Sequence, residues 1–159
     1  MPNDETGTTK DGDVFECWSM IAAIAAVTER LRIGSLVSPT TFRHPTVLAN
    51  TAATIDQISH GRLTLGIGAG WQINEHLAYG VDLLEGKDRV DRFEEAIQII
   101  VSMLTNDRTN FTGRHFQSQT QLVNPSQFKA SFRSWSEPAV RECQKLLLAT
   151  QTNGIPGAM

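Results

Sequence analysis

The residues that could take part in chemistry gather around one glycine-rich stretch, GRLTLGIGAGW, at residues 61–71. Gly66, Gly68 and Gly70 alternate at the end of a strand-like run, and Trp71 follows them directly. A dinucleotide-binding loop needs the spacing G-x-G-x-x-G, a helix after it, and an acidic residue about 20 positions on at the end of the next strand. Here Trp71 stands where the third glycine belongs, and no strand precedes Glu85. The spacing therefore opposes a dinucleotide-binding module.

Two interpretations of the glycines remain open, and both can hold at once. Glycine inside a strand often marks a bend or a bulge. Backbone without side chains also lets a planar ring approach the carboxyl end of a parallel strand, where ligands bind in α/β folds. Trp71 either belongs to the core or walls a pocket, and its place in the loop after such a strand favours the pocket.

Few other polar residues are candidates for a site. Arg43 could meet a phosphate, although a lone loop arginine is more often solvated. His44 precedes a proline and is expected to be structural. Glu75 and His76 could supply acid–base chemistry near Trp71, and a polar first helical turn explains them equally well. The sequence shows no Ser/His/Asp triad, metal cluster or phosphate loop, so the catalytic residues stay unknown and no metal is expected.

The elements that would position these residues alternate between helix and strand. Asp13 and Glu16 have the spacing of a capping box, which predicts that a helix starts near residue 14. Asp88 is predicted to cap the last helix, in which Glu95 faces water. The order indicates an α/β fold of parallel strands with covering helices and right-handed crossovers. We expect helices at residues 14–30, 45–59, 74–79 and from 88 to about 104, strands at 31–37 and 62–68, and a hairpin at 108–117.

Composition narrows the class of protein. The chain has 159 residues, 40% hydrophobic and 19% charged, with a net charge of −3. This charge gives no basic field for nucleic acid or acidic lipid. The longest apolar run is too short to cross a membrane, and the N-terminus lacks the parts of a signal peptide. Two distant cysteines suggest reduced thiols, and hence a cytoplasmic location.

Several of these segments together resemble the bacterial luciferase-like superfamily, and its deazaflavin-dependent oxidoreductase branch in particular. The matching pieces are AAVTERLRIGSLV (25–37), FRHP (42–45), DQISHGRLTLGIGAGW (56–71) and RFEEAIQII (92–100). The resemblance implies a TIM barrel that holds coenzyme F420 (a 5-deazaflavin) or, alternatively, FMN at the carboxyl ends of its strands. It implies hydride transfer or oxygen insertion on a small-molecule substrate.

The resemblance also suggests which residues contact the cofactor. It implies a bulge with a non-prolyl cis peptide at or near Ser35–Leu36, behind the central ring of the cofactor. The cofactor-binding residues are accordingly predicted to be Ser35, Leu36, Val37, Arg43, Gly68, Gly70 and Trp71. On this view the glycines make room for a ring system rather than for a pyrophosphate.

The chain is too short for a whole barrel, which needs about 250 residues. We expect a disordered N-terminus at residues 1–12, an incomplete TIM barrel at 13–117, and an atypical tail at 118–159. The tail lacks the glycine-rich phosphate loop of the family, and we interpret it as the product of a frameshift between about Gln117 and Phe128. An incomplete barrel leaves free strand edges, which predicts self-association. The alternative function is a non-catalytic remnant or an interaction protein without a cofactor.

Overall fold

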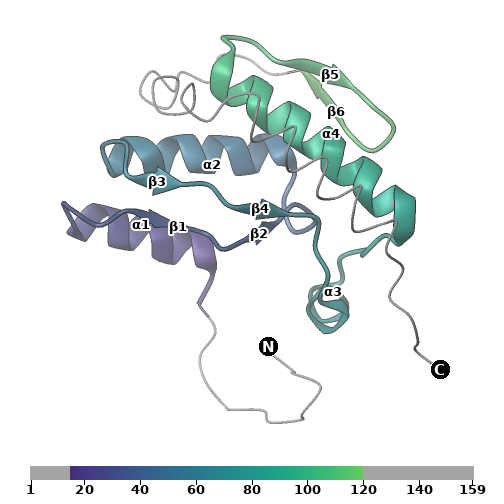
Figure 1. The fold of residues 1–159 in the computed structure, drawn as a ribbon, viewed down its shortest axis with the longest axis horizontal. Helices are drawn as coiled ribbons and strands as arrows, with labels where there is room; N and C mark the ends of the chain where they lie inside the picture. Colours follow the sequence, from purple (N-terminus) through teal and green to yellow (C-terminus); the bar gives the residue numbers. More distant parts are fainter. Residues whose placement is uncertain (1–14, 120–159) are drawn as a thin grey trace, which may run out of the picture.

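The structure is a computed structural model, and it describes residues 15–119 (Figure 1). Residues 1–14 and 120–159 are not described, so the predicted disordered N-terminus and nearly all of the predicted tail lie outside these residues. The elements are α1 (Cys17–Val27), β1 (Ile33–Gly34), β2 (Ser38–Pro39), α2 (Pro45–Ile58), β3 (Leu63–Thr64), β4 (Ile67–Gly68), α3 (Ile73–Tyr79), α4 (Gly86–Thr105), β5 (Asn110–Thr112) and β6 (Gln117–Gln119).

Two parallel strand paths form the centre of the fold, and each is interrupted once. β1 pairs with β3 and β2 pairs with β4, so the predicted strands at 31–37 and 62–68 are each split in two. Residues 35–37 bulge out between β1 and β2, and the bond between Leu36 and Val37 is cis. The cis bond thus lies one position beyond Ser35–Leu36. The bulge is held to the neighbouring path because Ser35 Oγ donates to the Gly66 carbonyl at 2.7 Å.

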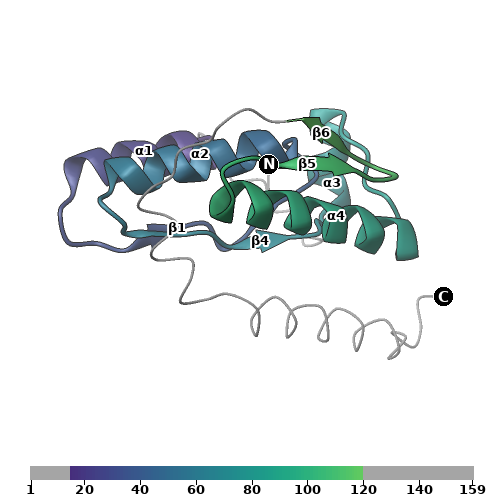
Figure 2. The same cartoon turned by 90° about the horizontal axis from the view of Figure 1, so that it is seen from above.

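Three helices cover these strands. α1 and α2 lie on one side of the strands, and α4 runs beside α2 (Figures 1 and 2). Their inward faces are apolar at helical spacing, which buries them against the strands and against each other. The predicted α/β arrangement of parallel strands with covering helices is confirmed. The centre of the core consists of Trp18, Ile21, Leu48, Ala52, Ile55, Ala96, Ile99, Ile100, Met103 and Leu104.

The starts of two helices differ from the predictions. α1 begins at Cys17, and the Glu16 carboxylate caps it by accepting from the backbone N–H groups of Trp18 and Ser19. The prediction that this helix starts near residue 14 was therefore wrong, because Glu16 caps the helix and does not belong to its first turn. α4 begins at Gly86, so Asp88 lies within the first turn, where its negative charge suits the helix dipole.

Arg62, directly before β3, links the C-terminal ends of α1 and α2. Its guanidinium donates to the carbonyl oxygens of Ala25, in the last turn of α1, and of Thr28 and Leu31, which follow the helix, at 3.0, 2.6 and 2.7 Å. Its Nε also donates to the carbonyl of Ser59, the cap of α2, at 2.7 Å. One side chain therefore satisfies carbonyl groups from the ends of two helices, which would otherwise lack donors.

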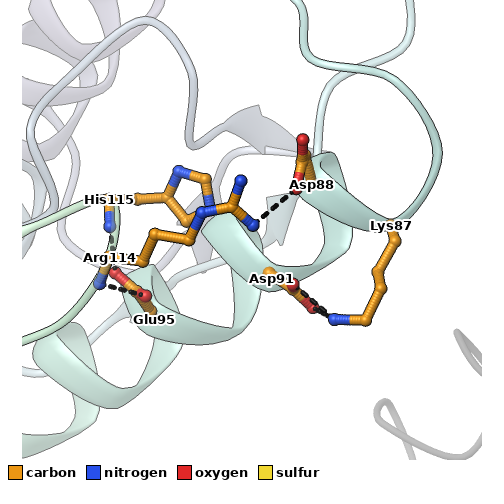
Figure 3. Close-up of polar contacts among 6 residues, drawn as sticks. All are labelled: Lys87, Asp88, Asp91, Glu95, Arg114 and His115. Carbon is orange, nitrogen blue, oxygen red and sulfur yellow. Dashed lines mark hydrogen bonds and ion pairs between the residues drawn. The ribbon is translucent and has the colours of Figure 1, made fainter.

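The hairpin of β5 and β6 rests on α4 through a carboxylate. Glu95 accepts the backbone N–H groups of Arg114 and His115 at 2.8 and 2.9 Å (Figure 3), and that of Phe116 at 3.0 Å. Glu95 was predicted to face water, and the hairpin turn covers it instead. The Arg114 guanidinium lies 2.8 Å from the Asp88 carboxylate, so the turn is also held by an ion pair.

Candidate cofactor seat at the strand ends

The carboxyl ends of the two strand paths lie next to each other. Pro39 pairs with Gly68, and the backbone N–H of Thr40 donates to the Gly68 carbonyl at 2.9 Å. The bulge at 35–37, which precedes Pro39 on the same path, also packs against the glycine-rich path, with Ser35 beside Gly66 and Val37 beside Gly68. Gly68 is therefore a neighbour in space of the predicted cofactor residue Val37, although 31 positions separate the two in the chain.

The alternating glycines let other parts of the chain come close. A Cβ at Gly66 would lie 2.2 Å from the Ser35 carbonyl oxygen, and a Cβ at Gly68 would lie 2.9 Å from a Val37 methyl carbon. Gly70 has φ of +85°, a conformation that glycine adopts freely. Gly66 and Gly68 thus make room for the bulge of the neighbouring path, whereas the sequence had suggested a bend or bulge of their own strand. Their role beside a cofactor ring stays a prediction.

Three apolar residues near these strands, Leu36, Val37 and Trp71, are exposed, and we call them the apolar rim. Leu36 is fully exposed, Val37 is 49% exposed and Trp71 is 79% exposed. The interpretation of Trp71 as a core residue is therefore wrong. Val37 lies beside the bare backbone of Gly68, and exposed apolar side chains of this kind are what a flat aromatic ring system covers.

His76 is buried, and its ring lies close to the backbone of Gly70, the residue before Trp71. It is 2% exposed and lies on α3, although the sequence suggested acid–base chemistry for it. Its Nδ1 lies 2.7 Å from the Gln72 carbonyl oxygen, and its Nε2 lies 2.8 Å from the Thr41 hydroxyl. Both ring nitrogens are thus engaged with the protein, so His76 holds structure here instead of facing a substrate.

Arg43 is turned away from the rim. It forms an ion pair with Glu16 and lines a shallow groove of about 420 Å³ between α1 and α2. Partial burial raises the pKa of Glu16, but the backbone and hydroxyl donors of Trp18 and Ser19, aided by Arg43, outweigh it and lower the pKa to about 2. Glu16 therefore stays charged at neutral pH, and Arg43 is not free to meet a phosphate in this arrangement.

His44 is structural, as predicted. It is the N-cap of α2, and its Nδ1 lies 2.7 Å from the Thr46 hydroxyl. Its ring meets the Phe116 ring edge-on, with centroids 5.3 Å apart, and burial lowers its pKa. Sequence reasoning missed Thr41, the partner of His76, because 35 positions separate the two residues and no local pattern links them.

Residues 15–119 contain no group of three or more histidine, cysteine or acidic side chains able to hold a metal ion. Over the same span, none of the helices combines the length and apolarity needed to cross a bilayer. Catalytic residues were left unknown from the sequence, and the described geometry assigns none.

Comparison with known proteins places this arrangement in a family. Residues 4–138 match the family model for luciferase-like monooxygenases. The F420-dependent glucose-6-phosphate dehydrogenase of Amycolatopsis mediterranei is 37% identical over 103 residues, which cover 63% of this chain and 31% of that protein. A pyrimidine monooxygenase of Acinetobacter baylyi is 33% identical over 118 residues, covering 70% of this chain and 30% of that protein.

A solved structure shares the fold. It is an F420-dependent secondary alcohol dehydrogenase in complex with an F420–acetone adduct, with a TM-score of 0.63 and 23% identity. The match covers 70% of this chain and 34% of that one. The predicted fold class, an incomplete TIM barrel, is thereby confirmed, and the chain spans about a third of the length of the proteins it matches.

Proposed function

The chain belongs to the luciferase-like monooxygenase family, a family of oxidoreductases and monooxygenases, and on this premise we propose that it is part of an oxidoreductase that seats coenzyme F420 at its strand ends. When bound, a deazaflavin supplies hydride transfer. The substrate would be a small molecule, as the names of the relatives suggest. FMN is the alternative cofactor, and with it the chemistry would extend to oxygen insertion.

The observation that carries this proposal is the exposed apolar rim. Leu36 and Val37 are exposed in the bulge between β1 and β2, where Val37 lies beside the side-chain-free Gly68, and Trp71 is exposed just after β4. The described residues leave Leu36 and Trp71 mostly uncovered and Val37 half covered, and a planar ring would bury the apolar surface that remains. The residues present therefore fit the ring of the cofactor. In this role Val37 and Gly68 would support the ring from behind, and Trp71 would flank it.

The experiment is a titration of the whole chain with coenzyme F420 and, separately, with FMN. Cofactor fluorescence reports binding, and thermal stability must rise with ligand concentration because only the folded state binds. Saturable binding of one cofactor supports the proposal, and the tighter one is the working cofactor. Absence of binding and of any thermal shift with both cofactors would overturn it.

Trp71 offers the sharpest variant for this titration. Trp71→Ala removes one wall of the seat, so we expect about fivefold weaker binding, which corresponds to roughly 1 kcal/mol of aromatic contact. Val47→Ala is the matched control, since Val47 is an exposed apolar residue on α2. Equal losses in both variants would show that the seat lies elsewhere.

A second candidate function is a non-catalytic role without a cofactor. One observation favours it: Arg43, the residue predicted to meet the cofactor phosphate, is held by Glu16. Under this alternative the apolar rim would contact a protein partner instead. The titration separates the two, because a chain that folds with a sharp melting transition and binds neither cofactor fits the second candidate alone.

A further inference from the structure

A buried hydrogen bond beside Gly70 joins the segment after β2 to α3. Thr41 follows β2, and His76 lies on α3, which follows the glycine-rich path. Their side chains are 7% and 2% exposed, and Thr41 Oγ1 lies 2.8 Å from His76 Nε2. The Phe42 ring packs on the imidazole, with centroids 4.7 Å apart, and excludes water from one side.

The hydrogen-bond partners of the His76 ring determine which of its two nitrogens carries the hydrogen. The Gln72 carbonyl oxygen can only accept, so His76 Nδ1 must carry the hydrogen that bridges their 2.7 Å separation. In the neutral ring Nε2 is then an acceptor, and the Thr41 hydroxyl must donate to it. Thr41 is therefore a donor that His76 needs, because a buried acceptor without a donor is unfavourable.

Gly70 rests directly on this pair. A Cβ built at Gly70 would lie 3.2 Å from His76 Nε2 and 3.2 Å from Thr41 Oγ1, so the backbone here is in close contact with both side chains. Gly70 also has φ of +85°, which turns the chain sharply before Trp71. The pair therefore lies against the turn that leads from β4 to Trp71.

We infer that Thr41 and His76 are positioning residues of the cofactor seat, whose hydrogen bond holds Gly70 and thereby directs Trp71 toward the ring. This inference rests on the proposed function, since it concerns the affinity of that same seat. Neither side chain touches the cofactor in this arrangement, because both are buried. Their contribution passes through the backbone of Gly70.

The test compares Thr41→Val with Thr41→Ser in the whole chain. Valine has nearly the shape of threonine but cannot donate, whereas serine keeps the hydroxyl. We expect Thr41→Val to bind F420 about tenfold more weakly and Thr41→Ser to bind like the wild type. Glu95→Gln is the stability control, because Glu95 holds the distant hairpin and its loss should lower stability without changing cofactor affinity.

A second measurement needs no variant. Nitrogen-15 NMR of the wild-type chain should show His76 as the neutral tautomer protonated at Nδ1, and saturating F420 should shift its ring signals. A ring protonated at Nε2, or ring signals unchanged by F420, would overturn the inference even if Thr41→Val does not fold.

The outcomes distinguish the two proposals. If the wild type binds F420 and Thr41→Val binds it equally well, the positioning role is wrong and the proposed function stands. If Thr41→Ser loses as much affinity as Thr41→Val, the hydroxyl is not what matters, and the inference also fails. If the wild type binds neither F420 nor FMN, the proposed function fails and the inference falls with it.

Discussion

Among residues 15–119, several carboxylates accept hydrogen bonds from backbone N–H groups, and Glu95 is the clearest example. It accepts three consecutive N–H groups of the hairpin turn. Burial raises the pKa of Glu95, but the backbone donors of His115, Arg114 and Phe116 outweigh it, so the net shift is downward. The ionised form is thus the one that the folded state prefers.

Replacing Glu95 by glutamine should therefore destabilise the fold. We expect a loss of about 1–3 kcal/mol at neutral pH, because charge-assisted hydrogen bonds become neutral ones and the turn keeps unpaired donors. Urea unfolding measures this loss, with Glu29→Gln at an exposed loop position as the control. No difference between these two variants would contradict the structural role of Glu95.

The same residue predicts a pH dependence. A carboxyl whose pKa is lowered on folding contributes stability above its ordinary value of 4.5, and this contribution fades as pH falls toward the lowered pKa of the folded state. The stability gap between the wild type and Glu95→Gln should accordingly narrow on acidification below pH 4.5. Urea unfolding across that range checks the sign, and a gap that widens toward acid would refute it.

Arg43 and Glu16 make a separate residue-scale prediction. If Arg43 meets the cofactor phosphate, it must first leave Glu16, and Glu16→Gln should release it. We expect F420 binding to tighten a few-fold, in keeping with the roughly 0.2–1 kcal/mol of an exposed ion pair. The double variant Glu16→Gln/Arg43→Ala should lose this gain. Unchanged affinity in Glu16→Gln would remove Arg43 from the seat.

At the scale of elements, the two strand paths depend on glycine at one crossing point. Gly66→Ala would place its Cβ 2.2 Å from the Ser35 carbonyl oxygen, which cannot move without breaking the bulge. Gly80→Ala meets nothing within 4 Å but carries the strain of φ at +64°. We expect Gly66→Ala to cost more, by about 1–3 kcal/mol of overpacking. Chemical unfolding of both variants tests this, and an equal cost would be contrary to it.

Much of the element order was predictable because the relevant signals are local. Pro45 at a helix start and the apolar positions of 93–104 fixed α2 and the body of α4, which the structure confirms to within a residue or two. The glycine-rich path was found in the same way. The likeness of these segments to a known family then supplied the barrel, which no periodicity within this chain could have done.

The remaining features depend on contacts between distant residues. Periodicity alone indicated continuous strands; the resemblance implied a bulge near Ser35–Leu36, and the structure shows how the Ser35 hydroxyl ties that bulge to Gly66. Thr41 carries no signal of its own, because its role exists only through His76. Arg43 looked like a free loop cation for the same reason, since Glu16 lies far away in the chain.

For the whole molecule, the open sheet is the dominant feature. Within residues 15–119, each of the two parallel paths pairs with the other and with no third strand, so both outer edges are free. Free edges favour pairing with another chain. We therefore expect the chain to associate with itself as its concentration rises. Analytical ultracentrifugation measures this, and a monomer at every concentration would contradict it.

The fan of hydrogen bonds around Arg62 has a consequence for motion. The Arg62 side chain binds carbonyls at the C-terminal end of α1 and at the end of α2. If one of these ends unfolds locally, Arg62 moves and the other end loses its hydrogen-bond donor as well. The amides at these two ends should therefore exchange their hydrogens with deuterium at matched rates, as one opening unit. Arg62→Lys should uncouple the rates, because an ammonium group cannot span the same set of oxygens.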